Sequence, residues 1–100
     1  MAQKAHLHLI DYAIGLGHSI TVDDGDGPDF ALERSRQPVK IKEAIEAVDV
    51  STIIIFDQSN ERLGSAMIVL DHGQDPEESV ADFSDNNYMN AWFDQYQATL

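Results

Sequence analysis

The sequence contains no cysteine and very few cationic residues. Its 100 residues include six Lys or Arg against 18 Asp or Glu, which gives a formal net charge of −12 at pH 7. Without cysteine, the chain has no disulfide framework and no thiolate ligand for zinc or an iron–sulfur cluster. With so few cations, it has no basic face to bind nucleic acid phosphates or an anionic membrane surface.

Long apolar runs are absent as well. No stretch approaches the roughly 18 apolar residues of a membrane-spanning helix, and the N-terminus lacks the charged-then-apolar pattern of a signal peptide. Hydrophobic residues still make up 43% of the chain, which suffices for one core and argues against a disordered acidic tail. We therefore expect a single soluble domain over residues 1–100, located in the cytoplasm (of the host cell, if the chain is viral).

The first half of the chain shows a helix followed by a hairpin. Residues 2–16 carry an apolar stripe at helical spacing, and Gly17 fits the left-handed position after the helix end. Ser19–Asp23 and Asp29–Arg34 each alternate apolar and polar residues, and a turn-rich cluster separates them. This order predicts a two-stranded hairpin.

A second helix and a second hairpin follow. Ser35 and Pro38 suit the start of a helix that ends near Val48. The β-branched run Ser51–Phe56 predicts a central strand, which a turn at Asn60 joins to a returning strand over residues 62–70. Gly64 in that strand indicates a bulge or a close contact.

The last 30 residues have a helical pattern. Asp75-Pro76-Glu77-Glu78 is a strong helix-start signal, and we expect one or two turns to continue to Phe83. Residues 87–98 read as a final helix, with Met89, Trp92 and Phe93 closing the core. The fold expected is α+β, with an antiparallel sheet of about four strands in the order α-β-β-α-β-β-α-α.

Motifs for metal binding and catalysis fail on spacing. The loop Asp23–Asp29 does not place acceptors and glycine as an EF-hand requires, so a solvated hairpin tip with at most weak cation binding is expected. His6 and His8 point to different sides of a helix, which predicts a partly buried His6 and a surface His8. No nucleophile lies in a recognisable setting, and Gly15-Leu16-Gly17 follows a helix instead of a strand. We expect no enzyme activity, no cofactor and no metal site.

The position of the charges is more informative than their sum. All six cations lie at or before Arg62, so residues 63–100 contain seven carboxylates and no Lys or Arg. A face of one sign steers cationic partners towards it, and neighbouring aromatic side chains add contact area. The residues expected to bind a partner are the seven carboxylates and two tyrosines: Asp71, Asp75, Glu77, Glu78, Asp82, Asp85, Asp94, Tyr88 and Tyr96.

Several short segments resemble small acidic accessory proteins of tailed bacteriophages. The resemblance is carried by residues 12–25, 32–35, 61–66 and 75–82 and by Trp92. It implies an early protein that interacts with host machinery such as nucleases, restriction or CRISPR complexes, or polymerases. It implies no catalytic residues.

Two functional hypotheses follow. In the first, the chain binds and inhibits or redirects a host protein with a basic surface. In the sharper form of this hypothesis, its carboxylates imitate the phosphates of a duplex. In the second, it is a structural or chaperone-like protein that self-associates through a sheet edge or the C-terminal aromatics. Its acidity would then serve solubility or adaptation to salt.

Overall fold

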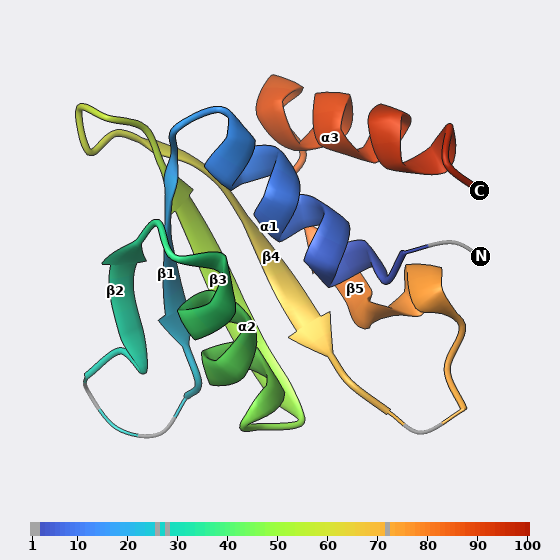
Figure 1. The fold of residues 1–100 in the computed structure, drawn as a ribbon, viewed down its shortest axis with the longest axis horizontal. Helices are drawn as coiled ribbons and strands as arrows, with labels where there is room; N and C mark the ends of the chain where they lie inside the picture. Colours follow the sequence, from blue (N-terminus) through green and yellow to red (C-terminus); the bar gives the residue numbers. More distant parts are fainter. Residues whose placement is uncertain (1–2, 26, 28, 72) are drawn as a thin grey trace.

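Five antiparallel strands form the sheet, in the order β2-β1-β3-β4-β5. We describe a computed structural model that covers residues 3–25, 27, 29–71 and 73–100 (Figure 1). The strands are β1 (Ser19–Asp23), β2 (Leu32–Ser35), β3 (Val50–Phe56), β4 (Arg62–Val69) and β5 (Val80–Phe83). The helices are α1 (Ala5–Gly15), α2 (Pro38–Glu46) and α3 (Asn87–Gln97), with a short 3₁₀ helix η1 (Pro76–Ser79) before β5. The predicted α+β class is confirmed, with five strands in place of about four.

The hydrophobic core lies between the helices and one face of the sheet. β3 buries Ile53 and Ile55, and β4 buries Ala66 and Ile68, because alternate side chains of a strand point to the same face. The strand β1 adds Ile20 and Val22, and the helices contribute the rest of the buried cluster: Ala5, Leu9, Ile10, Ala13, Ile41, Ile45, Met89, Trp92 and Tyr96. The predicted core role of Met89 and Trp92 is confirmed.

Local sequence signals place the turns correctly. Gly17 and Asn60 both have positive φ, at 81° and 65°, as expected for a residue after a helix and for a turn. Asp23 Oδ1 accepts a hydrogen bond from Gly25 N (2.9 Å) at the start of the β1–β2 loop. Residues 26 and 28 of that acidic loop lie outside the described part of the chain.

The expected short helix over residues 75–83 is only partly correct. A 3₁₀ helix begins after Asp75, but it ends at Ser79, and Val80–Phe83 is the edge strand β5. Ser79 is fully buried, and its hydroxyl accepts a hydrogen bond from His6 N (3.0 Å) and donates to Pro76 O (3.3 Å). This contact with α1 holds the chain at the point where it pairs with β4.

Candidate functional site

The segment without cations forms one side of the molecule. Residues 63–100 make up most of β4, η1, β5 and α3, which lie on the side opposite to β2 (Figure 1). The cations belong to other elements: Lys4 precedes α1, Arg34 and Arg36 lie in and after β2, Lys40 and Lys42 lie in α2, and Arg62 begins β4. Of these cations, Lys4 lies beside this segment, because it lines the same cleft as Asp71.

All seven predicted carboxylates of this side are exposed. We call them the acidic set: Asp71, Asp75, Glu77, Glu78, Asp82, Asp85 and Asp94. Within the described residues, none of them forms an ion pair with Lys or Arg. Two accept local hydrogen bonds, Asp82 from Phe83 N (2.9 Å) and Asp85 from Asn90 Nδ2 (3.0 Å). The acidic set thus presents its negative charge to solvent largely without neutralisation.

The two tyrosines predicted to accompany these carboxylates occupy different positions. Tyr88 is half-buried, and its hydroxyl lies 2.9 Å from His18 Nδ1, while Tyr12 packs edge-on against its ring. Burial raises the pKa of Tyr88 well above its ordinary value. Tyr96 is 1% exposed, stacks on Trp92 and donates a hydrogen bond to Gln3 O (2.8 Å). Tyr96 is therefore a core residue, which corrects its expected place on the partner-binding surface.

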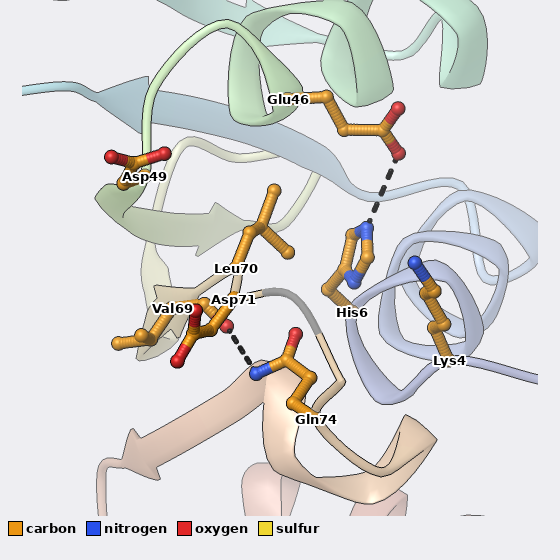
Figure 2. A pocket seen from close by; sticks show the side chains of 8 residues that line it. All are labelled: Lys4, His6, Glu46, Asp49, Val69, Leu70, Asp71 and Gln74. Carbon is orange, nitrogen blue, oxygen red and sulfur yellow. Dashed lines mark hydrogen bonds and ion pairs between the residues drawn. The ribbon is translucent and has the colours of Figure 1, made fainter.

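A cleft of about 590 Å³ opens where the acidic set meets the start of α1 (Figure 2). It lies between the first turn of α1, the C-terminal end of α2 and the loop after β4. The lining residues are Lys4, His6, Glu46, Asp49, Val69, Leu70, Asp71 and Gln74. Of these, only Asp71 belongs to the set predicted from the sequence.

His6 is the buried polar group of this cleft. It is 0% exposed, and Figure 2 shows its imidazole extending towards Glu46, with Nε2 3.5 Å from Glu46 Oε2. Burial lowers the pKa of His6, although the Glu46 carboxylate partly opposes this effect. A neutral ring beside a carboxylate carries its proton on Nε2, which leaves Nδ1 as an acceptor. Nδ1 is buried and has no hydrogen-bond partner among the described residues.

The charge of the cleft favours a cationic ligand. Glu46, Asp49 and Asp71 face one cation, Lys4, so with a neutral His6 the lining carries two net negative charges. Gln74 Nε2 donates to Val69 O (3.1 Å), which fixes the loop that carries Asp71. An ammonium or guanidinium group bound in the cleft would find carboxylate acceptors among its lining residues.

Metal-ligating and nucleophilic side chains are the other chemistry to consider at this site. Within the described residues, no three His, Asp or Glu side chains converge in a geometry that could hold a metal ion. His8, expected on the surface, is half-buried instead, with its Nδ1 accepting a hydrogen bond from Trp92 Nε1 (3.1 Å). His72 lies outside the described residues. The cleft residues around the His6–Glu46 pair include no serine, threonine or cysteine.

Comparisons with known proteins give no further assignment. The chain matches no protein-family model, no curated protein and no solved structure. In the described part of the chain, no helix has the length and apolar character needed to cross a membrane.

Proposed function

We propose that this chain is a non-enzymatic interaction protein that binds a basic host protein and inhibits or redirects it. The observation that supports this proposal is the acidic set, seven exposed carboxylates on one side of the molecule without ion pairs to Lys or Arg. The resemblance to accessory proteins of tailed bacteriophages favours a host protein as the partner.

The acidic set would act first at long range. Carboxylates without ion-pair partners on one side create a negative potential there. This potential extends about one Debye length into the solvent, roughly 8–10 Å at physiological salt. Such a potential orients a basic partner before contact and raises the association rate. We therefore expect binding to weaken strongly when salt is added.

The cleft would act at short range. A Lys or Arg side chain of the partner fits between Glu46, Asp49 and Asp71, with its N–H groups donating to their carboxylates. The half-buried Leu70 provides an apolar wall for the stem of such a side chain.

The dimensions favour a local contact over replacement of a long duplex. The longest extent of the molecule is 34 Å, and B-DNA of that length carries about 20 phosphates at one charge per roughly 1.7 Å. Seven carboxylates on one side supply a fraction of that charge. The partner we propose is therefore a protein with a compact basic patch, such as the nucleic-acid-binding surface of a nuclease or polymerase.

Capture from a bacterial lysate at low and high salt tests this proposal. We expect the immobilised protein to retain a basic nucleic-acid-binding protein at low salt and to release it at high salt. Added duplex DNA should compete for the same protein, whereas the chain alone should not retard DNA in a gel. Recovery of no basic protein at low salt would refute the proposal.

A further inference from the structure

One face of the sheet lies outside the hydrophobic core. Alternate residues of β3 and β4 point away from the helices, and we call the surface that they form the open face. Its apolar members are Val50, Ile54, Phe56, Met67 and Val69, none of which belongs to the core cluster. Val50 is 52% exposed and Met67 is 42% exposed. A contiguous apolar surface of this kind on a highly charged protein marks an interaction site.

Arginines occupy one end of the open face. Phe56 pairs with Arg62 across β3 and β4, and Arg62 Nη2 donates to Ser65 Oγ (3.1 Å), which places its side chain on this face. From the other side, the guanidinium carbon of Arg34 lies 4.8 Å from the centre of the Phe56 ring. Arg34 reaches Phe56 from β2 across β1, and its backbone N donates to Thr21 Oγ1 (3.0 Å). The two arginines thus flank one aromatic ring, and we call this line of residues the cationic row.

Aspartates occupy the opposite part of the same face. The strand register aligns four residues in one line across the sheet, which we call the acidic row: Asp23, Thr52, Met67 and Asp82. On β3, Ile54 lies midway between the two rows, two residues from Phe56 and two residues from Thr52. We call the line that runs through Ile54 across the strands, parallel to both rows, the Ile54 line. Each row is therefore about 7 Å from the Ile54 line, at roughly 3.4 Å per residue. With two arginines and two aspartates, the rows together carry no net charge, although the protein as a whole carries −12.

We propose that the open face binds a second copy of this chain, packed sheet to sheet about a twofold axis along the Ile54 line. This axis superimposes the cationic row of one copy on the acidic row of the other, and brings Arg62 near Asp82 of the partner. A twofold axis along the strands would instead place arginine on arginine and aspartate on aspartate, which charge repulsion disfavours. The neutral open face is also where two strongly acidic copies repel each other least.

The size of the open face predicts a weak, reversible dimer. The central strands are about 4.8 Å apart and span roughly 20 Å, so each copy contributes on the order of 400–500 Å² of projected area. Specific but transient complexes bury less than about 1,200 Å² in total. The dimer should therefore form in the micromolar range and dissociate on dilution.

Sedimentation equilibrium of charge-reversal variants tests the dimer. At moderate salt, the average mass of the wild-type protein should approach twice the monomer mass as concentration rises. Arg62→Glu should weaken association at least about tenfold, because the reversed side chain faces Asp82 of the partner. The double variant Arg62→Glu/Asp82→Arg has the wild-type net charge and restores the pairing, so it should associate as the wild type does.

Two further variants separate the open face from general charge effects. Lys40→Glu makes the same change in charge on an exposed residue of α2 and should leave association unchanged. Met67→Lys should weaken it, since that exposed side chain lies in the acidic row and would face the cationic row of the partner. A wild-type protein that stays monomeric would overturn the proposal. Equal loss of association in Arg62→Glu and Lys40→Glu would also overturn it, as would a double variant that does not regain association. The capture of a basic partner is a separate measurement, so the two proposals can fail independently.

Discussion

Gly64 lies so close to α3 that its replacement by alanine should destabilise the fold. A Cβ at this position would lie 2.6 Å from Met89 Cγ, 2.7 Å from Met89 Sδ and 3.3 Å from Ser84 Oγ. Carbon atoms in ordinary contact are about 3.5–4.0 Å apart. Met89 is fully buried, so its side chain cannot turn out into solvent and has to shift within the core. The φ angle of Gly64 is not positive, so the expected cost of substitution is one of packing alone.

The expected destabilisation of Gly64→Ala can be estimated from these contacts. Overpacking of a core costs about 1–3 kcal/mol, and the lower backbone entropy of alanine returns roughly 0.5–1 kcal/mol. A net loss of about 1–2 kcal/mol corresponds to a fall in Tm of roughly 4–16 °C for a domain of this size. Thermal and urea unfolding followed by circular dichroism would measure it. Gly15→Ala is the matched control, because a Cβ there meets nothing within 4 Å, and its stability should be unchanged or slightly raised.

A double-mutant cycle with Met89 makes the test specific. Met89→Ala alone should cost about 2–5 kcal/mol because it leaves a cavity. In Gly64→Ala/Met89→Ala the added methyl group fills part of that cavity, so the double variant should be more stable than the sum of the two single effects. Additive effects, or a Gly64→Ala variant as stable as the wild type, would refute this account of the β4–α3 contact.

Three further predictions concern stability. Tyr96→Phe removes the hydrogen bond to Gln3 O and should lower the free energy of unfolding by about 1 kcal/mol; an unchanged urea midpoint would contradict this. Because burial lowers the pKa of His6, the unfolded chain binds a proton before the folded one as pH falls through the ordinary value of 6.5. The wild type should therefore lose stability below that pH, by at most about 1.4 kcal/mol per pH unit from this group. The His6→Met variant should lose less stability over the same pH range. Parallel curves of unfolding free energy against pH for the two proteins would exclude the effect. Added salt should raise the Tm at neutral pH by screening repulsion within a chain of charge −12, and a Tm independent of salt would argue against that repulsion.

Local sequence patterns predicted most of the fold. The two hairpins, the three long helices, and the glycines at positions 17 and 64 could all be inferred from short-range periodicity and turn chemistry. The strand β5 could not, because Asp75-Pro76-Glu77 correctly signals a helical start and gives no measure of its length. That length depends on Ser79, which bonds to His6 from 73 positions away in the sequence.

The candidate site was predicted in part, for a comparable reason. Charge counting along the chain located the acidic set, because exposure is the normal state of unpaired carboxylates. It could not locate the cleft, where Lys4, Glu46, Asp49 and Gln74 converge from three separate segments. It also misplaced Tyr96, whose apolar ring fits the helical stripe of α3 as readily as it fits a binding surface.

Two variants of equal net charge test the central claim that the acidic side binds a basic partner. The first neutralises four carboxylates of the acidic set: Asp71→Asn, Asp75→Asn, Glu77→Gln and Glu78→Gln. The second neutralises four exposed carboxylates elsewhere: Asp11→Asn, Glu33→Gln, Glu43→Gln and Glu61→Gln. In capture from a bacterial lysate at low salt, the account predicts that the first variant loses the basic partner and the second retains it. Equal retention or equal loss by the two variants would contradict it.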